Sequence, residues 1–272
     1  MRKVLLFWIM VSCWMTACGS ANAPTEQAAT VTPRATPTPE PTILPLPAAT
    51  SRFSSEIVHF ITEDGLELSG TLFQSEGDAA VVLAHMAGPN DQQNWIPFAQ
   101  DIAARGFTAL TFDFRCYGDS DCGGADSGAI LLSRDVGAAI GVLRARGLQH
   151  IVCIGASMGG RGCVNAAFEH DLAGLVIVSG TGSSHPDRQH LDDIVSPDMP
   201  KLFVVAEHDQ TVGRTAEMTR LYESAPEPKV LQTFPGSAHG TELFDSRHAN
   251  AFHNVLLSFL EGVRASTDEA MQ

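Results

Sequence analysis

The segment HIVCIGASMGG, residues 150–160, decides the fold of this chain. It opens with a short apolar run typical of a buried strand and continues into a segment that can form a helix. Between the two stands Gly155-Ala156-Ser157-Met158-Gly159, a Gly-x-Ser-x-Gly string. Such a string is weak alone, but a strand before it and a helix after it are the context in which a serine becomes an exposed nucleophile. The glycines fit because side chains at 155 and 159 would clash with backbone in so sharp a turn.

In this arrangement Ser157 would stand at the carboxyl end of the strand and at the N-terminus of the helix. The helix dipole there favours developing negative charge, which suits an acyl-transfer reaction. The alternative is a serine that only caps the helix in a glycine-rich turn.

Strand-like and helix-like segments alternate on both sides of this string. Residues 56–74 have the pattern of a hairpin that turns at Glu63-Asp64-Gly65. Further strands are expected at 79–84, 108–114, 151–154, 175–179, 202–206 and 229–234, and helices at 95–105, 129–146, 158–169, 215–223 and 248–263. The alternation predicts an α/β fold with a mostly parallel, eight-stranded sheet and helices on both faces.

The charge of the chain excludes some classes of partner. The 272 residues include 31 acidic and 17 basic ones, for a net charge of −14. Binding of nucleic acid or of an anionic membrane surface needs clustered Lys and Arg, so neither is expected as a partner. No Cys or His spacing matches a zinc site, and we expect no metal and no cofactor.

The N-terminus has the pattern of an export signal. Met1-Arg2-Lys3 is followed by twelve almost wholly apolar residues, 4–15, too few to cross a bilayer as a stable helix. The string Met15-Thr16-Ala17-Cys18-Gly19 resembles the lipobox of bacterial lipoproteins, with Met15 where Leu is usual. The resemblance implies a signal peptide over 1–17 and lipidation of Cys18. Ordinary cleavage after Ala23 is the alternative, although the following proline makes that site a poor one.

A spacer is expected between this signal and the folded domain. Residues 21–50 hold seven Pro, seven Thr and seven Ala, with no Gly and no aromatic residue, a composition that cannot form a core. The alternative is a proline-rich ligand for a partner domain. We therefore expect residues 18–51 to tether a catalytic domain, residues 52–266, to the outer face of a bacterial membrane, with residues 267–272 as a C-terminal tail.

The region from Val82 to His253 resembles the α/β-hydrolase superfamily at five places, in the order of that family. The strings are LAHMAG at 83–88, FDFRCYGDS at 112–120, the Ser157 string, AEHDQTV at 206–212 and SAHG at 237–240. The resemblance implies a catalytic triad of Ser157, Asp209 and His239, which follows the family's chain order. His239 would accept the serine proton and Asp209 would fix the imidazole tautomer. For the acid, Glu207 is a nearby competitor, and Asp209 could instead cap the next helix.

The resemblance also implies an oxyanion hole, and here the sequence departs from the family. The expected donors are the backbone N–H groups of Met158 and Ala87. Met86 stands where the family usually has Gly, so it could displace the loop that carries Ala87. His85 is expected to brace this loop rather than to take part in catalysis.

Four cysteines belong to the expected domain. In an oxidising compartment Cys116 and Cys122 are close enough in one loop to form a disulfide, and Cys116 replaces a Gly of the family pattern. Cys153 in a buried strand and Cys163 in the following helix are expected to be small buried thiols.

The function that these features favour is hydrolysis of carboxylic esters through an acyl-enzyme. Only residues 180–200 stand where many family members carry a lid, so we expect no cap domain and a fairly open site for small or accessible esters. A peptidase, a dienelactone-type hydrolase or an acyltransferase of the same fold is the first alternative, although the dienelactone type normally uses Cys at the position of Ser157. A surface lipoprotein that binds without catalysis is the second. Sequence alone does not indicate the oligomeric state.

Overall fold

A computed structural model of the chain describes residues 53–123, 131–182 and 198–270. The expected signal peptide, Cys18 and the Pro/Thr-rich spacer lie outside the described residues. Residues 124–130, which include the first two residues of the predicted helix 129–146, and residues 183–197 lie outside them too.

The sheet has eight strands in the order β1-β2-β4-β3-β5-β6-β7-β8. β1 and β2 form an antiparallel hairpin, β2 pairs antiparallel with β4, and all other pairs are parallel. The strands are β1 (Ser54–Ile61), β2 (Glu67–Gln74), β3 (Ala79–Ala84), β4 (Thr108–Phe112), β5 (His150–Ala156), β6 (Gly174–Val178), β7 (Lys201–Ala206) and β8 (Lys229–Phe234). The predicted mostly parallel sheet of eight strands is confirmed.

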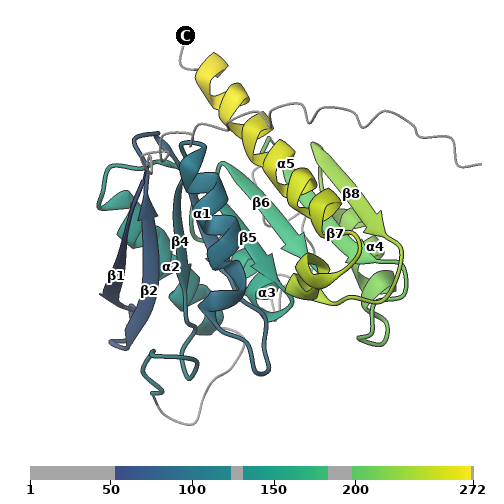
Figure 1. Ribbon diagram of the computed structural model, residues 1–272, viewed down its shortest axis with the longest axis horizontal. Coiled ribbons are helices and arrows are strands. Elements are labelled where there is room, and N and C mark those ends of the chain that lie inside the picture. Colours follow the sequence, from purple (N-terminus) through teal and green to yellow (C-terminus); the bar gives the residue numbers. More distant parts are fainter. Residues whose placement is uncertain (1–52, 124–130, 183–197, 271–272) are drawn as a thin grey trace, which may run out of the picture. The chain divides into compact units, whose positions relative to one another are not determined.

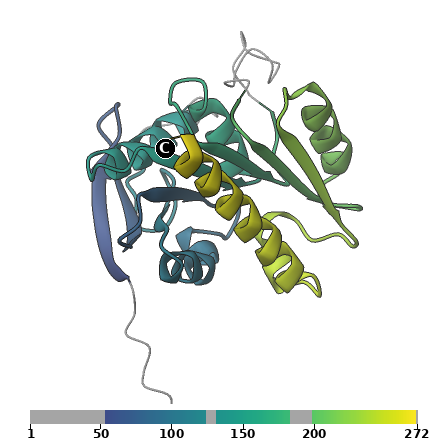
Figure 2. The same cartoon turned by 90° about the horizontal axis from the view of Figure 1, so that it is seen from above.

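Helices cover both faces of this sheet (Figures 1 and 2). One face carries α1 (Ile96–Ala104) and α5 (Ala249–Ala270), and the other carries α2 (Leu131–Arg144), α3 (Met158–Ala166) and α4 (Arg214–Ser224). Two short 3-10 helices, η1 (Gln92–Trp95) and η3 (Gly240–Asp245), lie in loops. No cap domain is evident in the described part of the chain.

Side-chain alternation along the central strands builds two cores. In β3, Val82 faces the core under α2 and α3, whereas Val81 and Leu83 face the core under α1 and α5. All six residues of β3 are buried, which explains why its sequence AAVVLA lacks the polar alternation of a half-exposed strand. Burial on both faces holds the strand ends in fixed register, and the site is built on those ends.

The last helix is longer than predicted, because the sequence pattern placed its end at Val263 and its true end is Ala270. The expectation of a tail beginning at residue 267 was therefore wrong for residues 267–270. The extra turns have no apolar stripe that a periodicity argument could detect. The hydroxyls of Ser266 and Thr267 instead donate to the backbone carbonyls four residues earlier, at 3.1 and 3.0 Å.

Two disulfides join the four cysteines of the domain. Cys116 pairs with Cys122, in agreement with the prediction. Cys153 of β5 pairs with Cys163 of α3, so the expectation of two free buried thiols was wrong. Both of these sulfurs lie in the core under α3, where strand and helix pack face to face.

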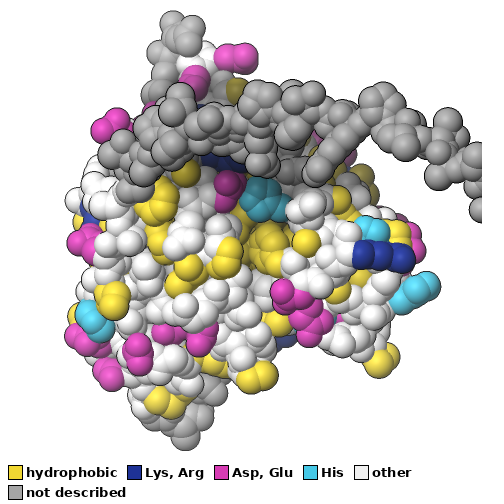
Figure 3. All heavy atoms as spheres, viewed as in Figure 1, with side chains coloured by type: hydrophobic (Ala, Val, Ile, Leu, Met, Phe, Trp, Pro, Cys, Tyr) yellow, Lys and Arg dark blue, Asp and Glu magenta, His cyan; other side chains and the backbone are white. Residues whose placement is uncertain are grey.

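On the face that α1 and α5 cover, acidic side chains are scattered rather than gathered into one patch (Figure 3). Within the described residues, no helix is both long enough and apolar enough to span a membrane.

Candidate active site

Ser157 occupies a strained turn between β5 and α3. Its backbone has φ +48° and ψ −106°, a region that residues other than glycine rarely adopt. A Cβ at Gly155 would lie 2.3 Å from the carbonyl carbon of Gly159, and a Cβ at Gly159 would lie 2.2 Å from the carbonyl oxygen of Ala84. Both glycines are therefore required by close backbone approach, as the sequence predicted.

Asp209 and His239 form a hydrogen-bonded pair at the same edge of the sheet. They follow β7 and β8, whose carboxyl ends lie at the same edge of the parallel sheet as that of β5, with β6 between β5 and β7. The Nδ1 atom of His239 is 2.8 Å from Oδ1 and 3.0 Å from Oδ2 of Asp209. With the proton on Nδ1, the ring donates to the carboxylate and leaves Nε2 free to accept a proton.

The carboxylate of Asp209 is held in its charged form. Burial alone would raise its pKa, since its side chain is wholly shielded from solvent. The ring of His239, the hydroxyl of Ser179 and the backbone N–H of Thr211 outweigh burial and hold the pKa below its ordinary value. The N–H of Thr211 lies 2.9 Å from Oδ1. A charged Asp209 can stabilise an imidazolium that forms during catalysis.

The loop that carries His239 is braced on both sides. The carboxylate of Glu242 accepts the backbone N–H of His239 at 2.9 Å. Gly240 packs against the strand before the nucleophile: a Cβ there would lie 3.4 Å from the Cβ of Ala156 and 2.7 Å from the sulfur of Met86. Met86, which replaces a Gly of the family pattern, therefore fills the space beneath the histidine loop.

A cavity of about 480 Å³ opens beside the nucleophile. Ser157, Met158 and Ala87 all line it. The N–H of Met158 belongs to the first turn of α3, whose backbone donors have no acceptor within the helix. The two residues proposed for the oxyanion hole therefore share one cavity with the serine, and Met86 does not displace Ala87 from it.

Of the three predicted triad residues, Asp209 and His239 are in direct contact, whereas Ser157 is not hydrogen-bonded to His239. Asp209 contacts His239, and the histidine loop packs on Ala156 beside the serine. No hydrogen bond within 3.5 Å joins the hydroxyl of Ser157 to the ring of His239. Glu207 is exposed and contributes only its backbone N–H, to Phe234, so it does not compete for His239.

His85 has the bracing role that the sequence predicted. Its ring is buried, with Nδ1 2.8 Å from the carbonyl oxygen of Met86 and Nε2 accepting the N–H of Phe114 at 3.0 Å. Burial lowers the pKa of this histidine, so the ring is neutral and fixes two loops against each other.

Several residues of the site were not found from the sequence. They include two of the arginines that line the cavity, Arg161 from α3 and Arg214 from α4, together with Thr181 after β6. Arg161 stands four residues after Ser157, a helical spacing that could have indicated its place. Arg214 carries no such signal, because it is brought to the cavity only by the packing of α4.

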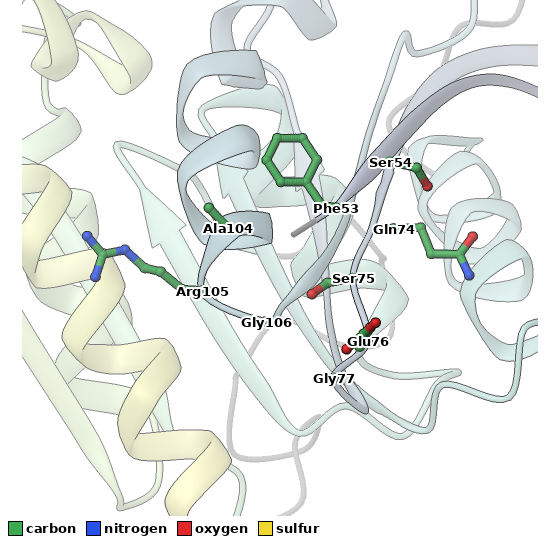
Figure 4. A pocket seen from close by; sticks show the side chains of 9 residues that line it. All are labelled: Phe53, Ser54, Gln74, Ser75, Glu76, Gly77, Ala104, Arg105 and Gly106. Carbon is green, nitrogen blue, oxygen red and sulfur yellow. The ribbon is translucent and has the colours of Figure 1, made fainter. Parts of the chain in front are cut away.

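A larger cavity, of about 810 Å³, lies at the opposite edge of the sheet (Figure 4). Residues before β3 and β4 line it, among them Ser75, Glu76 and Gly106, together with Phe53. It contains no histidine, and its serines have no adjacent base. Within the described residues, no group of three His, Cys, Asp or Glu side chains could hold a metal ion.

Comparison with known proteins agrees with this geometry. A family profile described as "alpha/beta hydrolase fold" matches residues 80–203. This chain has the α/β-hydrolase fold. No curated protein sequence matches it.

Three solved structures illustrate the likeness. An esterase from Pyrococcus furiosus is 18% identical, with a TM-score of 0.63 over 77% of this chain and 92% of that one. The α/β hydrolase GrgF from a Penicillium species is 18% identical, with a TM-score of 0.65 over 78% and 99%. A thermophilic esterase from Thermogutta terrifontis is 16% identical, with a TM-score of 0.59 over 76% and 99%.

Proposed function

We propose that this protein is an extracytoplasmic serine hydrolase that cleaves carboxylic esters through an acyl-enzyme. The observation that carries the proposal is the strained Ser157 at the sheet edge where Asp209 and His239 form their pair. Esterases among the structures of the same fold support the reaction class, and the apparent lack of a cap domain supports small or accessible esters.

In the proposed reaction each of these residues has a defined role. Nε2 of His239 accepts the proton of Ser157 as the hydroxyl attacks the ester carbonyl, and Asp209 stabilises the resulting imidazolium. The N–H groups of Met158 and Ala87 stabilise the oxyanion. His239 then returns the proton to the leaving alcohol. His239 next deprotonates a water molecule, which attacks the acyl-enzyme carbonyl, and returns that proton to Oγ of Ser157 as the carboxylic acid is released.

The location of the enzyme is part of the same proposal. The lipobox at Cys18 and the Pro/Thr-rich spacer would hold the domain on the outer face of a membrane. Two disulfides in one domain support an oxidising compartment.

Hydrolysis of 4-nitrophenyl acetate and butyrate, together with labelling by a fluorophosphonate, tests the activity. We expect the wild-type protein to hydrolyse both esters and to be labelled at Ser157. Ser157→Ala should lose the label and about 10⁴-fold or more in kcat. Ser75→Ala, in the cavity at the other edge of the sheet, is the matched control and should behave as wild type.

A wild-type protein that is neither active nor labelled would contradict the proposal and favour the non-catalytic lipoprotein. Retained activity in Ser157→Ala would show that another residue is the nucleophile.

A further inference from the structure

The cavity beside Ser157 is lined by positive charge, in a protein that is acidic as a whole. The chain has a net charge of −14, yet among the described residues three arginines and no carboxylate line the cavity. They come from three separate elements: Arg115 follows β4, Arg161 lies on α3 and Arg214 begins α4. Convergence of like charges from distant parts of the chain costs energy unless an anion compensates for it.

Arg115 is already neutralised and can be set aside. Its guanidinium is 3% exposed and binds two carboxylates, Asp64 at 2.8 and 3.0 Å and Asp135 at distances down to 2.7 Å. These bonds join the β1–β2 turn to α2. Arg115 is therefore a structural cross-link at the wall of the cavity.

Arg161 and Arg214 are different, because they contact two neighbouring residues in the segment after β6. Nε of Arg161 donates to the hydroxyl of Thr181 at 2.7 Å, and Nη1 of Arg214 donates to the carbonyl of Gly180 at 2.9 Å. Two guanidinium groups therefore approach one short segment from two sides. That segment follows the strand next to β5 and so lies beside Ser157.

Most donors of these two arginines are unused. Within the described part of the chain, the two terminal nitrogens of Arg161 have no acceptor and no carboxylate lies within 4.0 Å of them. The Nε of Arg214 is buried without a hydrogen-bond partner, in a side chain only 12% exposed. Such a buried donor is rare unless a ligand satisfies it.

Among the described residues, Glu217 is the acidic side chain that contacts this pair. It accepts from Nη1 of Arg214 at 2.9 Å, and its side chain is 36% exposed and stands three residues along the same helix. An ion pair between side chains one helical turn apart, with one partner partly exposed, contributes little. It leaves the rest of the Arg214 fork available to a ligand.

We propose that Arg161 and Arg214 bind a free carboxylate carried by the substrate, so that the favoured esters are anionic. The inference rests on the proposed ester hydrolysis. A guanidinium binds a carboxylate through two parallel hydrogen bonds, which gives direction as well as charge. Because Ser157 lines the same cavity of about 480 Å³, one small molecule can reach both groups. The substrate class is thus a half-ester of a dicarboxylic acid, or an ester of a carboxylate-bearing alcohol.

Matched ester pairs test the proposal. On the acyl side, 4-nitrophenyl hydrogen adipate is compared with its neutral methyl ester. On the alcohol side, 4-acetoxyphenylacetate is compared with its methyl ester. For at least one pair we expect kcat/KM to favour the anionic member by about 10- to 100-fold, the effect of one charged hydrogen-bonding site. The difference should appear mainly in KM.

Variants connect that preference to the arginines. Arg161→Gln should lower the ratio of kcat/KM between the anionic and neutral members of the pair towards one, and Arg161→Lys should restore part of that ratio. Arg214→Gln should act in the same direction. Arg220→Gln, on the exposed side of α4, is the matched control and should leave the preference unchanged.

The possible results separate this inference from the proposed function. Neutral esters that are hydrolysed with no preference in either pair would overturn the carboxylate site and leave the ester hydrolase standing. A protein inactive on every ester that still binds adipate by calorimetry, and loses that binding in Arg161→Gln, would support the carboxylate site and overturn the hydrolase. Inactivity without adipate binding would overturn both.

Discussion

The two edges of the sheet differ in a way that cavity size does not reveal. The cavity at the amino ends of the strands holds about 810 Å³ and the one at the carboxyl ends about 480 Å³, so the larger cavity is the one away from Ser157. Backbone strain makes the distinction clearer. Among the described residues, those other than glycine with positive φ are Cys116, Ser157 and Ser179.

Each of these three residues follows the carboxyl end of a strand, β4, β5 or β6. At the amino edge, by contrast, the left-handed positions of the turns before β4 and β5 are occupied by glycines, Gly106 and Gly147. A non-glycine residue in this region costs about 1–3 kcal/mol. Among the described residues, this strain occurs only at the carboxyl edge, where Ser157 lies. The difference between the two edges can be tested by mutation.

The largest expected effect is a loss of kcat when the catalytic base at the carboxyl edge is removed. His239→Ala should lower kcat for 4-nitrophenyl butyrate by about 10⁴-fold, because no group would then accept the serine proton. His208→Ala, an exposed histidine on the neighbouring loop, is the control and should retain the wild-type kcat. Equal kcat values for the two variants would remove the distinction between the edges.

Replacing one glycine at each edge should lower the stability of the protein in both cases but its activity in only one. A Cβ at Gly159 would lie 2.2 Å from the oxygen of Ala84, and one at Gly77 would lie 2.0 Å from the oxygen of Gly106. Both Gly159→Ala and Gly77→Ala should therefore lower the free energy of unfolding by about 2–3 kcal/mol in urea titrations.

Only Gly159→Ala should also lower kcat, by about 100-fold, since it moves the serine against the oxyanion loop. A comparable loss of kcat in Gly77→Ala would mean that the amino-edge cavity takes part in the reaction.

The two disulfides should contribute similar stability but differ in accessibility. Chain entropy for sequence separations of 6 and 10 gives about 2–3 kcal/mol for each, measured as the loss of unfolding free energy when both cysteines of a pair are replaced by alanine. Cys116 and Cys122 are exposed, whereas Cys153 and Cys163 are fully buried.

Mild reduction of the native protein should consequently free two thiols for alkylation, those of Cys116 and Cys122. Four labelled thiols without unfolding would contradict the burial of the second pair.

The smallest expected effect is on the pH dependence of stability. The pKa of Asp209 is lower in the folded protein than its ordinary value, so its charged form stabilises the fold above the unfolded-state pKa of about 3.9. This stabilisation is lost as the pH falls through the lower folded pKa. Unfolding free energies of wild type and Asp209→Asn should therefore converge as the pH falls below about 4. Glu76→Gln, an exposed carboxylate at the amino-edge cavity, should give no such convergence.

The sequence predicted the parts of the fold that local patterns specify. Gly155 and Gly159 indicated a sharp turn because only close backbone approach explains them, and the parallel sheet followed from the alternation of elements. These two inferences need only neighbours along the chain. Asp209 and His239 were instead assigned from the resemblance to the α/β-hydrolase superfamily.

Other features depend on contacts that no local pattern contains. Cys153 lies in a strand buried on both faces, so its run of apolar residues does not show which face the sulfur occupies. Its pairing with Cys163 became evident only from the packing of α3 on β5. Arg214 reaches the cavity through the packing of α4. The last turns of α5, after Val263, contain polar residues and two alanines but no large apolar residue.

The bond between Cys153 and Cys163 has a practical consequence for identifying the nucleophile by mass spectrometry. It closes a covalent ring in which Ser157 stands between the two half-cystines. Trypsin cleaves after arginine, and Arg161 lies inside this ring. A probe-labelled peptide with Ser157 would then stay attached to the peptide with Cys163, and a search for linear peptides would miss it. Reduction and alkylation before digestion releases the labelled peptide as one linear product.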